Sequence, residues 1–537
     1  MRWTDWVLTR VLRLPRPTTE YEVRRDVRVS MRDGVELLAD HYAPTASRPA
    51  GTILVRGPYG RRGIGALVSA RAYAARGYHV VMQSTRGTFG SGGEFAPIVH
   101  EVEDGADTVA WLRDQPWFTG RFATMGGSYL GYTQWAMLVD PPPEFATAVI
   151  SVAPHDLSAA AWGTGAFALS DFLGWSDLVA HQEDGGLKPL VHGVTARWRI
   201  APALDGLPLG DAGRTLLRDR APWYQSWVSE SDVSAAYWQP TRADAALDQV
   251  KVPVLLQTGW QDVFFDQTLH QFARLRARGV DAALTVGPWT HMEIGTRGAG
   301  EVARESLDWL AEHLAGLPVR RRSDPVRIFV TGGVGWRDLS DWPPATSEKI
   351  LYLQPLLLLG DEQPSPAAAP SRFVYDPADP TPTIGGRMLS DSGYRDDTRL
   401  AERDDVLSFT STALTENLEV VGSPAVELVH STDIPHADVF VRLSEVDAMG
   451  TSRNVSDGYL RLSDDRPATL RIELDAIAHR FRAGHRIRML IAGGSHPRFA
   501  RNLGTAEPAI TGHRLARCTH TVAHGSGGVS RVVLPVA

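Results

Sequence analysis

The stretch FATMGGSYLGYTQWAMLV, residues 122–139, carries the most specific local pattern of this sequence. Residues 122–125 predict a short strand, residues 126–128 a tight turn, and residues 129–139 a helix that follows without a linker. Glycines permit a strained turn, and the helix N-terminus contributes positive potential. These features are typical of a nucleophile elbow centred on Ser128. An ordinary strand–turn–helix is the alternative, because the second glycine is Gly131 and the usual G-x-S-x-G spacing is not met.

A serine nucleophile needs a base, and the base needs an acid that orients it. Asp262 follows the predicted strand at 252–258, and His291 follows the predicted strand at 282–287. Open α/β sheets place their sites beyond the carboxyl ends of strands, and the chain order Ser, Asp, His is that of α/β-hydrolases. We therefore predict Ser128, Asp262 and His291 as a catalytic triad. Taken singly, the aspartate could be a helix cap and the histidine a structural residue.

An oxyanion formed on the substrate also requires hydrogen-bond donors. The apolar run 51–56 predicts a buried strand, and it ends in Gly57-Pro58-Tyr59-Gly60. We expect the Tyr59 hydroxyl and the backbone N–H of Tyr129 to form the oxyanion hole. A tyrosine packed at a turn is the alternative interpretation of Tyr59.

The wider pattern predicts a parallel sheet with crossover helices, interrupted by a helical insertion and followed by an all-β region. A hairpin around Asp33-Gly34 opens this pattern, and short alternating runs, beginning at 326–331, fill the chain after residue 318. The expected segments are an N-terminal helical extension (1–24), the first part of the core (25–154), a helical cap (155–249), the second part of the core (250–317) and a jelly-roll β-sandwich (318–537).

The N-terminal segment MRWTDWVLTRVLRLPRP has apolar residues at helical spacing, interrupted by charges. It lacks the uninterrupted apolar core and small-residue cleavage site of a secretory signal. We expect an amphipathic helix that packs on the body of the protein, with docking to a membrane surface as the weaker alternative. No apolar run reaches 18 residues, so no membrane span is predicted.

Composition excludes several classes of protein. The chain has 537 residues, of which 43% are hydrophobic and 22% charged, which is ordinary globular composition. A formal net charge of −7 gives no reason to expect nucleic acid as a partner. The single cysteine, Cys518, excludes an intramolecular disulfide and a cysteine-based zinc cluster, and it permits the cytoplasm, where we expect the protein.

Other catalytic motifs are missing from the sequence. None of the three lysines, Lys188, Lys251 and Lys349, completes the S-x-x-K of serine β-lactamases. The H-E-x-x-H pattern of zinc proteases and the G-x-x-x-x-G-K-[ST] pattern of P-loops are also missing. We therefore expect no metal and no cofactor.

Several segments together resemble the CocE/NonD hydrolases, the group that includes cocaine esterase and the X-Pro dipeptidyl peptidases. The similar segments are GGSYLG (126–131), RGPYG (56–60), VVMQSTRGTFGSGGEF (80–95), EDGADTVAWLRDQPW (103–117), GWQDVFF (259–265) and GPWTHM (287–292). The resemblance covers nearly the whole chain from about residue 25. One departure is Ser84, which stands where an Asp is usual and puts a structural contact of its loop in doubt.

The resemblance implies an α/β-hydrolase fold with a helical cap insertion and a C-terminal jelly roll. It also implies Ser128 as nucleophile, His291 as base and acid, Asp262 as the orienting acid, and Tyr59 with Tyr129 at the oxyanion. The aromatic residues expected near the acyl pocket are Trp162, Trp175 and Phe264, for which packing in the core or cap is the alternative.

The reaction expected from the resemblance is hydrolysis of a small carboxylic ester with an apolar or aromatic acyl group. The apolar residues Val263, Phe264 and Phe265 after Asp262 give no support to a pocket for a substrate ammonium. X-Pro dipeptidyl-peptidase or amidase activity, or acyl transfer or cyclisation by the same triad, remain alternatives. We also expect a homodimer, and sugar binding by the jelly roll is a possible second function that the sequence does not favour.

Overall fold

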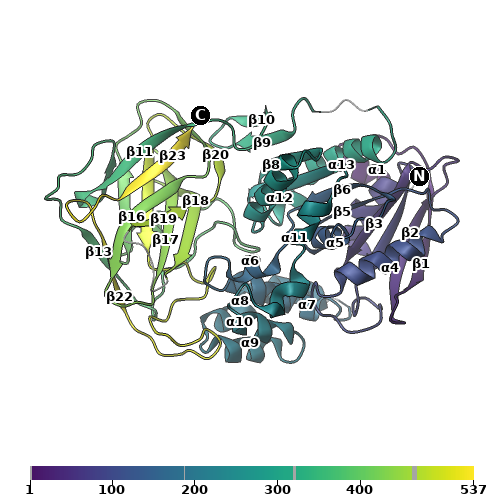
Figure 1. Cartoon of the computed structure of the whole chain (residues 1–537), viewed down its shortest axis with the longest axis horizontal. Coiled ribbons are helices and arrows are strands. Elements are labelled where there is room, and N and C mark those ends of the chain that lie inside the picture. Colours follow the sequence, from purple (N-terminus) through teal and green to yellow (C-terminus); the bar gives the residue numbers. More distant parts are fainter. Residues whose placement is uncertain (1–2, 187, 319–321, 463–468) are drawn as a thin grey trace. The chain divides into compact units, whose positions relative to one another are not determined.

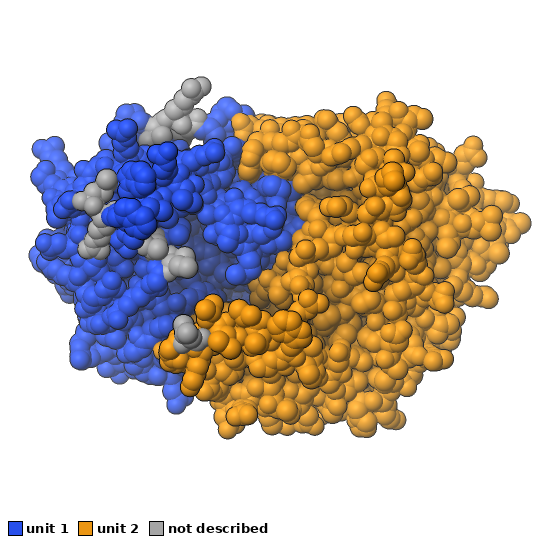
Figure 2. Space-filling model, turned by 180° about the vertical axis from the view of Figure 1, so that it is seen from behind, with its two compact units in different colours: residues 1–158, 234–327 blue, residues 159–233, 328–537 orange. Residues whose placement is uncertain are grey.

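The computed structural model describes residues 3–186, 188–318, 322–462 and 469–537. The chain forms two compact units, residues 1–158 with 234–327 and residues 159–233 with 328–537 (Figure 2). Figure 1 shows that the first contains a sheet with helices along it, and the second contains short helices and an all-β region. This confirms the predicted α/β-hydrolase fold class with an additional C-terminal β domain.

Strands β1 to β8 organise the first unit, and they belong to a ten-stranded sheet with the order β1-β2-β4-β3-β5-β6-β7-β8-β9-β10. Pairing is parallel from β4 through β3, β5, β6 and β7 to β8, and antiparallel at β1–β2 and β2–β4. Every residue of β3, β4 and β6 is buried, as expected for parallel strands covered on both faces. The strands are β1 Tyr21–Ser30, β2 Glu36–Pro44, β3 Gly51–Gly57, β4 Tyr78–Ser84, β5 Phe122–Gly127, β6 Phe145–Ser151, β7 Val254–Gln261, β8 Ala282–Thr290, β9 Val326–Val330 and β10 Gly335–Leu339.

Helices connect these strands. They are α1 Trp3–Val11, α2 Gly63–Ala66, the π-helical turn Leu67–Arg71, α3 Ala72–Ala74, α4 Glu101–Arg113, α5 Tyr129–Met137, the 3-10 helix Ala236–Thr241, α11 Asp244–Gln249, α12 Phe265–Ala277, the 3-10 helix Glu293–Gly295 and α13 Ala299–His313. The connection between β3 and β4 is therefore divided into a π turn and short α turns.

The N-terminal helix packs on the first unit, although not through its tryptophans. Trp3 and Trp6 are exposed, whereas Asp5 is buried and accepts a hydrogen bond from the Tyr21 hydroxyl at 3.1 Å. Arg71 forms an ion pair with the same carboxylate at 3.1 Å. The helix is thus held by polar contacts that include one buried acid, and its apolar contacts come from leucines, Leu8 within it and Leu12 and Leu14 just beyond its end.

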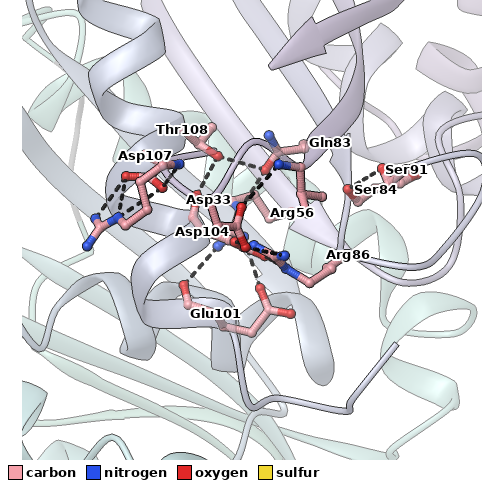
Figure 3. A network of polar contacts seen from close by, with 12 residues as sticks. Asp33, Arg56, Gln83, Ser84, Arg86, Ser91, Glu101, Asp104, Asp107 and Thr108 are labelled. Atoms are coloured by element: carbon pink, nitrogen blue, oxygen red, sulfur yellow. Dashed lines mark hydrogen bonds and ion pairs between the residues drawn. The ribbon is translucent and has the colours of Figure 1, made fainter. Parts of the chain in front are cut away.

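The loop after β4 keeps its structure with Ser84 at its start. The Ser84 hydroxyl accepts a hydrogen bond from Arg61 at 2.6 Å, and the Ser91 hydroxyl donates to the Ser84 carbonyl at 2.9 Å (Figure 3). Arg61 also forms ion pairs with the carboxylates of Asp26 at 2.7 Å and Asp40 at 3.3 Å. Ser84 is therefore held by an arginine whose carboxylate partners lie in β1 and β2.

The second unit contains the helical segment and most of the β region. The helices in or entering it are α6 Leu157–Trp162, α7 Leu169–His181, α8 Lys188–Asp205, α9 Leu209–Leu217, α10 Trp223–Ser229 and α14 Thr398–Ala401. The strands are β11 Ser347–Gln354, β12 Leu358–Gly360, β13 Ser371–Tyr375, β14 Val406–Ser411, β15 Leu418–Gly422, β16 Ala425–Thr432, β17 Asp438–Val446, β18 Ser452–Arg461, β19 Thr469–Glu473, β20 Ile477–Phe481, β21 Arg486–Ala492, β22 Cys518–Val522 and β23 Arg531–Val536.

These thirteen strands are antiparallel except for the pair β12–β14, and their alternating inward residues form one apolar core. One prediction about the sheets was wrong. The run at 326–331 was expected in the jelly roll, but β9 and β10 continue the ten-stranded sheet beside β8. Alternation reveals a strand, but it does not reveal which sheet provides its partner.

Candidate active site

Four of the residues predicted for the site follow the carboxyl ends of parallel strands of the ten-stranded sheet. Tyr59 lies two residues after β3, Ser128 directly after β5, Asp262 directly after β7 and His291 directly after β8. The strands β7 and β8 run three residues further than predicted, so that Asp262 and His291 are the first residues beyond them. All four therefore lie at one edge of the sheet, where α/β folds place their sites.

Ser128 occupies the strained position of the strand–turn–helix. Its backbone has φ 58° and ψ −125°, a conformation that residues with a side chain rarely adopt. The turn is held by hydrogen bonds from the Ser128 N–H to the Ser151 carbonyl at 3.0 Å and from the Gly131 N–H to the Ser128 carbonyl at 2.9 Å. The side chain is half-buried at the start of α5, as an elbow nucleophile requires.

Sterics explain the glycines around this serine. A Cβ on Gly126 would lie 2.5 Å from the Leu130 Cβ, and Gly126 itself has φ 148°. A Cβ on Gly131 would clash with the Ala153 Cβ beyond β6. The second glycine is thus required at position 131, because α5 packs closely at this point on the segment that follows β6.

Asp262 and His291 form a buried pair. The His291 Nδ1 lies 2.7 Å from the Asp262 Oδ1, and the Thr258 hydroxyl donates to the Asp262 Oδ2 at 2.9 Å. Both carboxylate oxygens are therefore engaged, and the Asp262 side chain is fully buried. A carboxylate on Nδ1 selects the imidazole tautomer that carries the proton there, which leaves Nε2 as the acceptor. This arrangement makes His291 suitable as a general base.

Close contact between β7 and β8 brings this pair together. A Cβ on Gly259 would clash with the Trp289 carbonyl, and a Cβ on Gly287 would clash with the Trp289 ring. The strand register shifts between Gly259 and Gln261, so the strands end with the two site residues side by side. Gly259 and Gly287 are thus required for the close packing of the strands that place Asp262 beside His291.

The two tyrosines predicted for the oxyanion hole lie close to each other. The ring of Tyr59 meets the ring of Tyr129 edge-on, with centroids 6.4 Å apart. Tyr59 is half-buried, whereas Tyr129 is buried at the start of α5, where backbone N–H groups point out of the helix. The Tyr129 hydroxyl donates to Glu101 at 2.8 Å and accepts from the Ile98 N–H at 2.7 Å. Burial raises the pKa of the Tyr129 phenol well above its ordinary value, and the Glu101 charge adds to this effect.

The aromatic residues predicted for the acyl pocket lie in two different places. Phe264 meets the His291 ring edge-on, with centroids 5.4 Å apart. Trp162 is buried in the helical segment, where its Nε1 donates to the Trp227 carbonyl at 2.8 Å, and Trp175 packs on the Trp227 ring. Each of these tryptophans has partners among the helices of the second unit, and their role at an acyl pocket stays a prediction.

Among the described residues, one group has the composition of a metal site. Ligand atoms of Asp177, His181 and His192 lie within 4.8 Å of one another. However, the Asp177 carboxylate already forms a two-pronged ion pair with Arg199, and the two imidazoles are stacked with centroids 3.8 Å apart. Because a metal binds in the plane of an imidazole ring, stacked rings are poorly placed to share one ion. The group is therefore explained as a polar contact between α7 and α8.

Sequence reasoning missed two residues beside the site, Glu101 and Arg56. Glu101 accepts the Tyr129 hydroxyl, and the Arg56 Nη2 lies 3.0 Å from the Glu101 carboxylate, with both side chains buried (Figure 3). Arg56 left a signal in the sequence, because a charged residue within the apolar run GTILVRG requires a buried partner. Nothing local identifies that partner, which is 45 residues further along the chain.

A sheet of this order, with a serine at the turn after β5 and an acid and a histidine after later strands, is that of the α/β-hydrolases. The chain is a serine hydrolase of this class. It belongs to the CocE/NonD family: it is 30% identical to cocaine esterase of Rhodococcus sp. (strain MB1 Bresler), over 96% of this chain and 99% of that protein. The resemblance predicted from the motifs is thereby confirmed.

The family match extends over both regions of the chain. Residues 33–293 match the X-Pro dipeptidyl-peptidase (S15 family), and residues 319–533 match the X-Pro dipeptidyl-peptidase C-terminal non-catalytic domain. A putative serine esterase of Mycobacterium bovis is 25% identical over 88% of this chain and 90% of its own.

Two solved structures share the fold. An aminopeptidase from a marine sediment archaeon, Thaumarchaeota archaeon, and an α-amino acid ester hydrolase each have a TM-score of 0.80 at 23% identity, over 97% of both chains. Among the described residues, no helix combines the length and apolar character needed to cross a membrane.

Proposed function

We propose that the protein hydrolyses a small carboxylic ester through an acyl-enzyme on Ser128. The observation that carries this proposal is the hydrogen bond between His291 and the buried Asp262, at the same sheet edge as the strained Ser128. His291 takes the Ser128 proton as the hydroxyl attacks the carbonyl carbon, and it returns that proton to the leaving alcohol. Water, deprotonated by the same imidazole, then releases the acid and restores the serine.

The oxyanion of each tetrahedral intermediate is held by the Tyr59 hydroxyl and the Tyr129 backbone N–H. Their position beside the elbow and the contact between their rings support this assignment. Donors fixed before the reaction stabilise the charge that develops in the transition state without being reorganised. The chemistry is completed by side chains and backbone of the chain itself.

An apolar or aromatic acyl group is the substrate class that these observations favour. Phe264 packs against the proposed base, and the residues that flank it, Val263 and Phe265, carry no charge. The ester hydrolases among the relatives support an ester in preference to an amide.

The first test is hydrolysis of p-nitrophenyl acetate and butyrate. We expect wild type to be active and Ser128→Ala to lose at least about 10³-fold in kcat, because the covalent route is removed. Ser347→Ala, an exposed serine at the start of β11, is the matched control and should keep wild-type rates. Equal activity in wild type and Ser128→Ala would reject the proposal.

A second test separates ester hydrolysis from its alternatives. A p-nitrophenyl ester of benzoic acid should be cleaved with a far higher kcat/KM than a Gly-Pro p-nitroanilide, if the substrate is an ester without a free ammonium. Preference for the anilide would instead indicate a dipeptidyl peptidase. Product analysis with an added alcohol acceptor shows whether water resolves the acyl-enzyme, because acyl transfer yields a new ester in place of the acid.

A further inference from the structure

We propose that the buried Arg56–Glu101 pair is a positioning device for the oxyanion hole, which holds Tyr129 from one side and the segment leading to Tyr59 from the other. The inference rests on the proposed function of Ser128 and its two oxyanion donors. It assigns to Arg56 and Glu101 a role in the geometry of the transition state, without contact with the substrate.

Glu101 divides its two carboxylate oxygens between two different parts of the site. Its Oε1 accepts the Tyr129 hydroxyl at 2.8 Å, and its Oε2 lies 3.0 Å from the Arg56 Nη2. The Tyr129 hydroxyl is fixed a second time by the Ile98 N–H at 2.7 Å. One tyrosine side chain thus has both its donor and its acceptor role fulfilled, which leaves the first residue of α5 a single orientation.

Arg56 joins four elements through its guanidinium and its backbone carbonyl. Its Nε donates to the Gln83 side chain of β4 at 2.7 Å, and its Nη1 donates to the Glu101 carbonyl of α4 at 3.1 Å (Figure 3). Its own carbonyl, in β3, accepts the Thr133 hydroxyl of α5 at 3.2 Å. The helix leaves room for this arrangement, because a Cβ on Gly105 would lie only 3.1 Å from the Arg56 Nη1.

The end of β3 also packs directly on the start of α5. A Cβ on Gly57 would clash with the Leu130 side chain, so this glycine lets β3 lie directly against the start of α5. Tyr59 follows Gly57 by two residues, and Tyr129 precedes Leu130 by one. The spacing between the two oxyanion donors is therefore set by this contact and by the ion pair behind it.

The electrostatics of the pair argue against a role in stability alone. Burial raises the pKa of the Glu101 carboxyl, although the nearby Arg56 charge opposes this effect. Buried ion pairs contribute little net stability compared with apolar residues of similar volume. A pair with that cost, placed between the two proposed oxyanion donors, is explained if the donors must keep a fixed separation.

The test uses Tyr129→Phe and Glu101→Gln in the full chain, with Glu103→Gln as the matched control. Tyr129→Phe keeps the backbone N–H and the ion pair but removes the hydroxyl that bonds Glu101 and the Ile98 N–H, and the exposed Glu103 lies on the same helix as Glu101. We expect kcat for p-nitrophenyl butyrate to fall about 10–100-fold in both site variants, with KM changed less than about threefold. The control should match wild type.

Two further readouts distinguish positioning from general loss of structure. Inhibition by phenylboronic acid, whose tetrahedral adduct mimics the oxyanion, should weaken in parallel with kcat, whereas competitive binding of the product acid should not change. The loss in kcat of the double variant Glu101→Gln/Tyr129→Phe should be no greater than that of the more impaired single variant, because both changes break the same link between Tyr129 and Glu101.

The outcomes also separate this inference from the proposed function. If a fluorophosphonate fails to label Ser128 in wild type, the proposed function is wrong and the inference falls with it. If wild type is labelled and active, but Tyr129→Phe keeps its kcat and boronate affinity, the positioning role alone is rejected. Losses that simply multiply in the double variant would also contradict it. Should Glu101→Gln fail to fold, Tyr129→Phe decides the question alone.

Discussion

Each of the two compact units buries an arginine against a carboxylate, and the two pairs differ in what they connect. In the β region Arg442 meets Asp457 with two parallel hydrogen bonds of 2.6 and 2.8 Å. These residues are direct cross-strand partners on β17 and β18. In the first unit Arg56 and Glu101 come from a strand and a helix, and Glu101 shares its second oxygen with Tyr129.

The difference teaches how to interpret a buried charge. The Arg442–Asp457 pair repeats a contact that the strand register already makes. Its further contacts, with Arg498 at 3.0 Å and with the Ile384 carbonyl at 2.6 Å, also lie in the β region, so its effect is on the stability of that region. The Arg56–Glu101 pair transmits position between elements that end at the candidate site. Tyr129→Phe, which keeps the Arg56–Glu101 pair, should therefore lose rate with little loss of stability, and variants of the β-region pair should lose stability at nearly constant rate.

The largest expected effect on rate is that of Asp262→Asn. The amide keeps the shape of the buried side chain but favours the wrong tautomer of His291, and in a well-studied serine protease this exchange costs about 10⁴-fold in kcat. We expect a loss of that order with a melting temperature close to wild type, measured with p-nitrophenyl butyrate and by thermal unfolding. Asp266→Asn, on the exposed side of α12, is the control. A fully active Asp262→Asn enzyme would remove this residue from the triad.

The largest expected effect on stability is that of Asp457→Ala. It leaves the fully buried Arg442 without its main counter-charge, which costs about 3–5 kcal/mol in the free energy of unfolding. Asp361→Ala, which breaks an exposed pair with Lys349, should cost about 0–1 kcal/mol. Urea unfolding measures both, and kcat of the folded enzyme should be unchanged. Comparable losses in the free energy of unfolding for the two variants would contradict the role of the Arg442–Asp457 pair in stability.

Tyr59→Phe should lower kcat about 10²–10³-fold, the usual effect of removing one oxyanion donor. The enzyme should be impaired without being inactive, because the Tyr129 N–H remains. Tyr237→Phe, at an exposed position, controls for the loss of a hydroxyl. An unchanged kcat would exclude Tyr59 from the oxyanion hole.

A further expected effect is on the pH dependence of stability in the first unit. His41 is buried with its Nε2 3.0 Å from the His79 Nδ1, and burial, together with the charge of His79, lowers the pKa of His41 to about 3. The folded protein therefore keeps this imidazole neutral, whereas the unfolded chain protonates it near pH 6.5. The contribution of the neutral His41 to the free energy of unfolding is complete above pH 6.5 and is lost as the pH falls toward 3.

The free energy of unfolding should consequently fall by up to about 1.4 kcal/mol per pH unit from this group alone. His41→Gln should flatten the dependence between pH 6.5 and 4 in urea titrations, and His513→Gln, an exposed histidine, should not. The same slope in all three proteins would contradict the assignment.

Much of this protein was determined by its sequence alone, because the signals are local. The elbow at Ser128 follows from glycines that no larger residue can replace, and the strands before Asp262 and His291 are short apolar runs with clear ends. The chain order Ser, Asp, His then indicated the sheet of an α/β-hydrolase. The motifs in these same segments indicated the family. An alternating pattern after residue 318 was enough to predict a β domain.

The tertiary structure decided which distant segments meet. Arg56 showed that a buried partner must exist, but only the packing of α4 behind the elbow selected Glu101. Arg61, which donates to Ser84, pairs with Asp26 and Asp40 of distant strands, and β9 lies in the ten-stranded sheet although its pattern resembles the strands that follow it. The physical reason is common to all three: hydrogen bonds and ion pairs depend on proximity in space, and periodicity along the chain carries no information about a partner tens of residues away.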